Sequence, residues 1–408
     1  MINPKYDEID GCVCRPTLEA IGSPVDLAIL SVGSHNLEVV FEQAVSAKAR
    51  ALVIFDGCYL EDDPSPRLLE RLRRRAVETG VPVMGGNGMG FFNFDTQCHA
   101  SFHQIGSRKA GGITLVAHSG SVATVLGFND QRYRFNLLIS SGQEIGTSVA
   151  DYIDYALTVP TTRVIALFME AARDPPGLTA ALEKAADRDI PVVICKVGRT
   201  EKSARLALSH SGAVTGSDDA FAAALRRSGA IKVDDLDEMM STAALLSTGR
   251  RPGFGGFASV MDSGGLRELA IDLAEDIALE FAHYSDATRA KLRKALPDIL
   301  PVSNPLDAAG PLDDGFFDVF SNSLVIMARD DSVAILGLEI GISDDDIYSE
   351  RMFEIAKNLG HLTEKPVVFF SSFADVLNAR IADEFIDCDI PVISGLRKTL
   401  TAVRNALL

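Results

Sequence analysis

The chain has 408 residues, of which 47% are hydrophobic and 23% are charged, and its formal net charge is −17. These proportions are typical of folded globular proteins and exclude wholesale disorder, and the length indicates about two to four domains. Because no basic block offsets the negative charge, binding to the phosphate backbone of nucleic acid is not expected.

A membrane anchor, a disulfide framework and a metal site are not expected either. No apolar run approaches the length of about 20 residues that crosses a membrane. The first ten residues, MINPKYDEID, lack the basic and apolar regions of a signal peptide. The cysteines are scattered, and no second pair at zinc spacing accompanies Cys12 and Cys14. We therefore expect free thiols in a reducing cytoplasm.

Short apolar runs alternate with helical periodicity along the first quarter of the chain. The expected strands are residues 25–32, 51–57 and 81–86, and the expected helices between them are residues 37–49 and 66–80. Such alternation indicates parallel strands with right-handed crossovers. The arginines of the second helix, at positions 71 and 73–75, are expected to form a solvated face.

The same alternation continues in two further blocks. Strands are expected at residues 113–120, 134–143, 162–174 and 190–198, and then at 257–265, 332–340, 365–372 and 390–395. A basic, Gly-rich linker at 247–256 separates the blocks. We therefore predict an α/β protein with three consecutive doubly wound parallel-sheet domains, at residues 1–105, 106–251 and 252–408.

One stretch, LALSHSGAVTGSDDAF at residues 206–221, places a histidine in what we expect to be a Gly-punctuated loop before a helix. Gly212 allows close approach of the backbone to a ligand, and the following helix N-terminus favours an anion. A similar loop, HSGS, stands at residues 118–121, and two such termini aimed at one point would make a phosphate site. A neutral His210 is suited to accept a phosphoryl group there, with Glu170 fixing its tautomer. The other interpretation of His210 is a loop histidine that caps a helix.

These segments, in this order, resemble the nucleoside-diphosphate-forming acyl-CoA synthetases. That superfamily includes the α subunit of succinyl-CoA synthetase, the ADP-forming acetyl-CoA synthetases and feruloyl-CoA synthetase-like proteins. The sequence SHSGAVTGSD at 209–218 resembles its phosphohistidine loop, AHSGS at 117–121 its S-[QR]-S-G phosphate loop, and MGGNGMGFFN at 84–93 its G-P-N-C-x-G turn. Further similar segments are residues 2–11, 165–174, 192–210, 261–275 and 296–310.

The resemblance implies a Rossmann-like CoA-binding domain, N-terminally short, followed by two flavodoxin-like domains. It implies His210 as the phosphorylated nucleophile and Glu170 as its hydrogen-bonding partner. Around the phosphate it implies Ser119, Gly120, Gly212 and Ala213. Along the CoA it implies Lys5, Ser31, Val32, Gly57 and Asn87. The implied reaction interconverts acyl-CoA, phosphate and ADP with acid, CoA and ATP, through an acyl phosphate and phospho-His210, with Mg²⁺ accompanying the nucleotide.

The sequence departs from the family pattern in four places. The first strand of the CoA-binding domain and its Gly-rich turn have no counterpart, so the chain is expected to start inside that domain. The turn at 85–90 lacks Pro and Cys, and His118 stands where the family has Gln or Arg. No ATP-grasp portion is recognisable, so ATP, ADP and Mg²⁺ would be bound by an ATP-grasp β-like partner subunit, or the chain would form a homo-oligomer.

These departures leave a second hypothesis, in which the chain is a catalytically incomplete module that binds CoA or an acyl-CoA and regulates a partner. A third hypothesis, a generic dinucleotide-binding protein, is disfavoured because no G-x-G-x-x-G follows a first strand.

Overall fold

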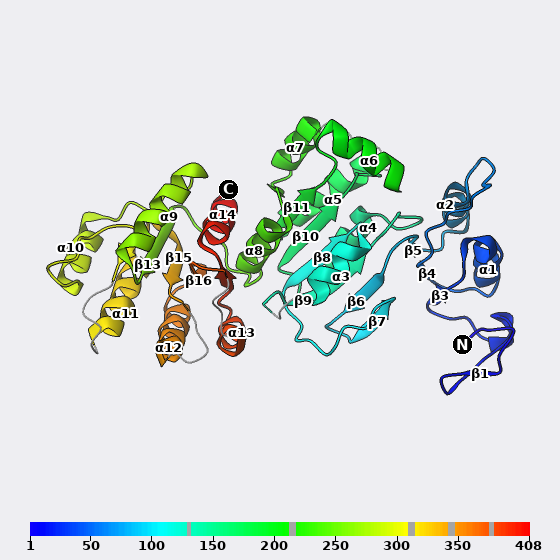
Figure 1. Cartoon of the computed structure of the whole chain (residues 1–408), viewed down its shortest axis with the longest axis horizontal. Helices are drawn as coiled ribbons and strands as arrows, with labels where there is room; N and C mark the ends of the chain where they lie inside the picture. Colours follow the sequence, from blue (N-terminus) through cyan, green and yellow to red (C-terminus); the bar gives the residue numbers. More distant parts are fainter. Residues whose placement is uncertain (129–131, 212–217, 309–314, 342–346, 375–378) are drawn as a thin grey trace.

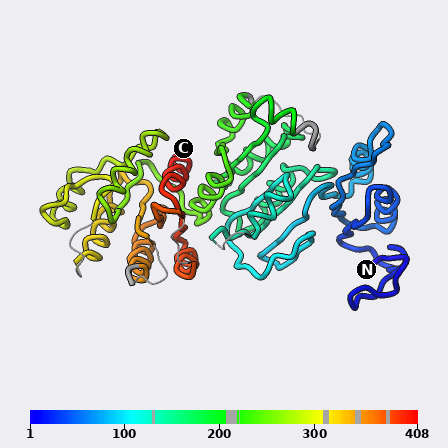
Figure 2. Tube along the Cα trace, in the orientation of Figure 1, coloured from blue at the N-terminus to red at the C-terminus, as the bar shows by residue number. Residues whose placement is uncertain are grey.

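The computed structural model describes residues 1–128, 132–211, 218–308, 315–341, 347–374 and 379–408. Three α/β units follow one another along the longest axis of the molecule, with the first unit at one end and the third at the other (Figures 1 and 2). The chain therefore has the α/β fold class that its sequence predicts. No helix within the described ranges is long and apolar enough to cross a lipid bilayer.

The first unit contains a three-stranded parallel sheet in chain order, β3 (Ala28–Leu30), β4 (Leu52–Ile54) and β5 (Val83–Gly85). A short hairpin, β1 (Glu8–Ile9) and β2 (Cys12–Val13), and the 3₁₀ turn η1 (Glu19–Ile21) precede it. The crossover helices are α1 (Ser34–Ser46) and α2 (Leu68–Thr79). Each helix buries one apolar stripe at helical spacing, Leu37, Phe41 and Ala44 in α1 and Leu68, Leu72 and Ala76 in α2.

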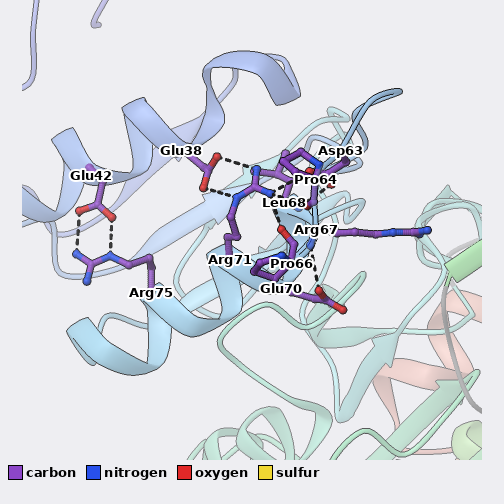
Figure 3. A network of polar contacts seen from close by, with 10 residues as sticks. All are labelled: Glu38, Glu42, Asp63, Pro64, Pro66, Arg67, Leu68, Glu70, Arg71 and Arg75. Atoms are coloured by element: carbon purple, nitrogen blue, oxygen red, sulfur yellow. Dashed lines mark hydrogen bonds and ion pairs between the residues drawn. The ribbon is translucent and has the colours of Figure 1, made fainter.

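The arginines of α2 do not form the solvated face that we expected, with the exception of Arg74, which is exposed. Arg71 and Arg75 lie one helical turn apart. Each guanidinium donates two hydrogen bonds to one carboxylate of α1, Arg71 to Glu38 and Arg75 to Glu42, at 2.6–2.9 Å (Figure 3). Arg71 also bonds Asp63 and the carbonyl oxygen of Pro66, which fixes the loop before α2. The side chain of Arg73 instead reaches the second unit. Through Arg71, Arg73 and Arg75, helix α2 is therefore joined to α1 and to the second unit.

The second unit contains a seven-stranded sheet in the order β12-β11-β10-β8-β9-β6-β7. Its strands are β6 (Gly90–Asn93), β7 (Cys98–Ser101), β8 (Ile113–Ala117), β9 (Phe135–Ser140), β10 (Val164–Met169), β11 (Val192–Lys196) and β12 (Ile231–Val233). The five strands from β8 onward are parallel, and their order is the flavodoxin-like 2-1-3-4-5.

The hairpin β6–β7 is antiparallel and pairs with β9, a connection that the sequence did not predict. Residues 90–101 thus belong to the sheet of the second unit, although they precede the boundary that we placed near residue 105. The boundary by hydrogen bonding falls between β5 and β6.

The helices of the second unit are α3 (Gly120–Phe128), α4 (Val149–Ala156), α5 (Pro175–Asp187), α6 (Glu201–Ser211), α7 (Asp218–Arg227) and α8 (Leu236–Leu246). Residues 206–211, which we expected in a loop, form the second half of α6. Helix α7 begins where the sequence predicts a helix N-terminus.

The third unit repeats the flavodoxin-like order in five parallel strands, β14-β13-β15-β16-β17. The strands are β13 (Gly256–Met261), β14 (Leu306–Asp307), β15 (Val333–Glu339), β16 (Val367–Ser371) and β17 (Val392–Ser394). The helices are α9 (Gly264–Asp276), α10 (Asp286–Ala295), α11 (Gly315–Ala328), α12 (Ile347–Leu362), α13 (Ala379–Asp387) and α14 (Leu396–Leu407). Helix α14 packs against α8 of the second unit, and Asn405 donates hydrogen bonds to Glu238 and Thr242 across that contact.

Replacing Arg71 by Met should lower the melting temperature of the protein by about 2–4 °C, because the variant leaves Glu38, Asp63 and the Pro66 carbonyl without their common donor. Arg74→Met, on the exposed side of the same helix, is the control and should leave the melting temperature unchanged. Equal melting temperatures for the two variants, measured by circular dichroism, would show that the network of Figure 3 adds nothing to stability.

Candidate functional site

The strand order reverses between the neighbours β8 and β10, and in open α/β sheets ligands bind outside the carboxyl ends of the strands at such a point. His118 is the first residue after β8, and Glu170 is the first residue after β10. The Glu170 amide donates a hydrogen bond to Nδ1 of His118 at 3.1 Å, and the His118 amide donates to the carbonyl oxygen of Phe168 at 3.0 Å. The fold thus brings together two positions that are 52 residues apart in the sequence.

The other ring nitrogen of His118 contacts a buried carboxylate. Nε2 lies 3.2 Å from Oε1 of Glu144, and only 2% and 3% of the two side chains are exposed. The same Oε1 accepts the Val149 amide at 2.7 Å, and Nε of Arg173 lies 3.5 Å from Oε2. Among the described side chains of this site, the histidine–carboxylate pair is therefore His118 and Glu144.

The predicted pair of Glu170 and His210 is only partly within the described structure. His210 lies in the last turn of α6, and its side chain is outside what the structure describes. The carboxylate of Glu170 forms no hydrogen bond or ion pair with another described residue. Their interaction therefore stays a prediction.

The predicted phosphate loop lies next to His118. Ser119 and Gly120 are half-buried at the N-terminus of α3, where Oγ of Ser119 accepts the Val122 amide at 3.4 Å. Met89 packs against Gly120, since a Cβ there would lie 2.6 Å from Cγ of Met89. Free N–H groups in a first helical turn suit an anion. Gly212 and Ala213, the other two predicted phosphate-binding residues, lie outside the described residues.

Four of the five residues predicted along CoA lie at one edge of the first sheet. Ser31 and Val32 follow β3, Gly57 follows β4, and Asn87 follows β5. Asn87 has a left-handed backbone, with φ of 52°, and its amide donates to the carbonyl oxygen of Asp56 at 2.8 Å. Lys5 lies ahead of β1, and none of the described contacts joins its ammonium group to this edge.

A short segment after β9, residues 142–146, connects the carboxyl edge of the first sheet to the sheet of the second unit. The amides of Gln143 and Ile145 donate to the carbonyl oxygens of Gly86 and Gly85, at 2.7 and 2.8 Å. Gly142 must be glycine at this contact, because its φ is +62° and a Cβ would lie 2.2 Å from the Gly86 oxygen. Nη2 of Arg73 donates to the carbonyl oxygen of Gln143 at 2.6 Å. The predicted CoA edge and the pair of His118 and Glu144 are therefore directly connected.

Glu144, Arg173 and Lys196 also lie at these strand ends, and they were not predicted as site residues. Lys196 ends β11 beside Met169 of β10 and is 3% exposed. Burial lowers the pKa of its ammonium group, which lies 5.6 Å from the ring centroid of Phe221. A single charge ending an otherwise apolar strand was the available signal for Lys196. Glu144 and Arg173 lie in loops, where nothing in the sequence distinguishes them.

The third unit carries a different group at the corresponding crevice, between β13 and β15. The segments MDSGG and NPLD, noted separately in the sequence, meet there, because β13 and β14 pair Met261 with Asp307. The carboxyl groups of Asp262 and Glu339 interact electrostatically there. Burial, followed by the charge of Asp262, raises the pKa of Glu339 to about 7, and burial also raises the pKa of Asp262. No cluster of three or more His, Cys, Asp or Glu side chains suited to a metal occurs in the described part of the chain.

Comparison with known proteins identifies two of the three units. A family model described as a CoA binding domain matches residues 1–93, and one described as a succinyl-CoA ligase like flavodoxin domain matches residues 110–246. An ADP-forming acetate–CoA ligase I of Archaeoglobus fulgidus is 30% identical over 338 residues, which are 82% of this chain and 48% of that protein. A trans-feruloyl-CoA synthase from an unknown prokaryotic organism is 28% identical, over 97% of this chain and 56% of that protein.

A solved structure shares the fold of the whole chain. It is the dinucleotide-forming acetyl-coenzyme A synthetase 1 of Ca. Korarchaeum cryptofilum, in complex with phosphate and ADP, with a TM-score of 0.86 and 21% identity over 100% of this chain and 87% of that chain. This chain spans about half the length of the curated relatives named above. The chain belongs to the nucleoside-diphosphate-forming acyl-CoA synthetase superfamily, as the sequence motifs predicted.

Glu339→Gln should weaken the pH dependence of stability. The pKa of Glu339 in the folded protein lies above its value of about 4.3 in an unfolded chain, so its protonated form contributes stability that is lost as pH rises through about 7. The urea midpoint of the wild type should therefore fall from about pH 5 to about pH 8, and fall less in the variant. Glu364→Gln, at an exposed position, is the control; an identical fall in all three proteins would contradict the prediction.

Proposed function

We propose that this chain is the α-like half of an ADP-forming acyl-CoA synthetase, an acid–thiol ligase that interconverts acyl-CoA, phosphate and ADP with acid, CoA and ATP. The observation that carries the proposal is the contact of segment 142–146 with Gly85 and Gly86, because it connects the predicted CoA edge to the unit that contains the predicted phosphate-binding residues Ser119 and Gly120. A thioester on one edge and a phosphate on the other would thereby meet in one crevice.

In the first step, an oxygen of inorganic phosphate attacks the thioester carbonyl. The carbon–sulfur bond breaks, the CoA thiolate leaves and takes up a proton, and an acyl phosphate remains. The amide groups at Ser119 and Gly120, with Gly212 and Ala213, would hold the phosphate, and Ser31, Val32, Gly57, Asn87 and Lys5 would contact CoA.

In the second step, a ring nitrogen of His210 attacks the phosphorus atom, and the carboxylic acid leaves as its carboxylate. A carboxylate on the other ring nitrogen would fix the tautomer of the nucleophile, which is the role of Glu170 in this proposal. Transfer from phospho-His210 to ADP then yields ATP.

The nucleotide step requires further protein. ADP, ATP and Mg²⁺ would be held by an ATP-grasp partner subunit, and two relatives from Pyrococcus furiosus, 26% and 23% identical, are named as α subunits. The substrates are CoA and a carboxylic acid, and the site of action is the cytoplasm. The relatives are named for acetate, 4-hydroxybutyrate and trans-ferulate, so a panel of acyl-CoAs is the appropriate test for the acyl group.

His210→Asn should abolish phosphorylation of the chain. The wild type, incubated with phosphate, Mg²⁺, the partner subunit and a panel of acyl-CoAs, should gain the mass of one phosphoryl group with at least one of them. The gain should be absent in His210→Asn and present in His361→Asn, a control on the exposed surface of α12. Measurement is by intact mass spectrometry.

Phosphorylation that persists in His210→Asn would disprove the assigned nucleophile. CoA binding by calorimetry without any phosphorylation of the wild type would support the alternative, a CoA-binding or regulatory module.

Glu170→Gln should slow formation of the phosphohistidine by about 10- to 100-fold, because a neutral amide supports the tautomer of the nucleophile less well. CoA affinity should be unchanged, since no described hydrogen bond or ion pair joins the Glu170 carboxylate to the first unit. Quenched-flow counting of labelled phosphate on the protein measures the rate. Glu183→Gln, on the exposed face of α5, is the matched control, and equal rates for the two variants would remove Glu170 from the mechanism.

A further inference from the structure

His118 is buried, and both of its ring nitrogens are engaged. Nδ1 is 3.1 Å from the Glu170 amide, and Nε2 is 3.2 Å from the Glu144 carboxylate. A backbone N–H can only donate, so Nδ1 must be the unprotonated acceptor, and Nε2 must carry the proton that it donates to Glu144. A ring held in this way is neutral and has no free lone pair, so it is unable to act as the phosphoryl acceptor.

The backbone of Glu170 depends on this ring. Glu170 follows the last residue of β10, and its amide donates to the side chain of His118, the first residue after the neighbouring strand β8. Without that acceptor, a half-buried N–H would lose its partner, at a cost that favours movement of the loop. The carboxylate of Glu170 moves with that backbone.

The ring itself is held from the side of the first unit. Glu144 has a left-handed backbone, with φ of 53°, and its two neighbours, Gln143 and Ile145, donate amide hydrogen bonds to Gly86 and Gly85. Arg73 of α2 fixes the Gln143 carbonyl from the same side. A continuous series of hydrogen bonds thus runs from the turn that precedes Asn87, through Glu144 and His118, to Glu170.

We propose that His118 is a positioning residue that, as a neutral Nε2–H imidazole anchored by Glu144, holds the backbone of Glu170 in register with the turn at Gly85 and Gly86. This inference rests on the proposed function. There the role of Glu170 is to orient His210, the phosphoryl acceptor, and His118 would hold Glu170 in place for that role when the turn at Gly85 and Gly86 is bound to segment 142–146. His118 touches none of the reacting atoms.

The functional test compares His118→Leu with His118→Gln. Leu fills the space but offers neither donor nor acceptor, so kcat for phosphohistidine formation should fall about 10- to 100-fold, with KM for acyl-CoA changed less than about twofold. Gln can donate to Glu144 and accept from Glu170 through its amide, and it should restore most of kcat. A rise in KM that accompanies the fall in kcat of His118→Leu would overturn the proposal. So would a folded His118→Gln variant that does not restore kcat.

Two spectroscopic readouts do not require activity. In ¹⁵N-histidine-labelled wild type, the ring signal that disappears in His118→Gln should show a protonated Nε2 and an unprotonated Nδ1. Amide hydrogen exchange at Glu170 should be slow in the wild type and in His118→Gln, and faster in His118→Leu. A protonated Nδ1, or equal exchange in the three proteins, would refute the positioning role.

These readouts separate the two proposals. If no acyl-CoA phosphorylates the wild type but the tautomer and the exchange pattern are as stated, the proposed function fails and the positioning of Glu170 stands. If the Leu variant does not fold, the tautomer in the wild type and the rescue by Gln still decide the outcome.

Discussion

The amide hydrogen bonds from Gln143 and Ile145 to the carbonyl oxygens of Gly86 and Gly85 are the contact on which the candidate site depends. They connect the three-stranded sheet of the first unit to the segment that follows β9 in the sheet of the second unit. The contact is close because Gly142 has no side chain. Main-chain hydrogen bonds form the centre of this junction, and the side chains of Arg73 and Gln143 add hydrogen bonds to the carbonyl oxygens of Gln143 and Gly57.

The second and third units show how different chemistry is placed on one topology. Both have the strand order 2-1-3-4-5, and both gather buried polar side chains where the order reverses. In the second unit the pair is an imidazole and a carboxylate, His118 and Glu144, with Arg173 nearby. In the third unit it is two carboxyl groups, Asp262 and Glu339, and burial raises the pKa of both. The fold determines where these sites lie, and the side chains determine what each can do.

The apolar runs predicted every parallel strand except the short edge strands β12 and β14, because strands buried on both faces leave a near-continuous hydrophobic signal. The hairpin β6–β7 left no such signal, since CHAS at residues 98–101 is short and mostly polar, and its pairing with β9 is a long-range contact. The domain boundary near residue 105 stays a prediction, although residues 90–101 pair with the sheet of the second unit. Helix α6 extends through residues 206–211 because an Ala- and Leu-containing run continues the helical period, which the two serines beside His210 obscured.

By itself, the sequence determined the α/β class, the order of the strands in the chain, the superfamily, and the candidate residues that short motifs carry, such as Ser119, Gly120 and Asn87. Motifs are local, and so is the hydrophobic period that defines each strand. Only the tertiary structure decided that Glu144 anchors His118, that His118 holds the Glu170 backbone, and that Arg73 reaches the second unit. These contacts join residues 26 to 70 positions apart, and their partners are chosen by packing and burial, which no single stretch of sequence encodes.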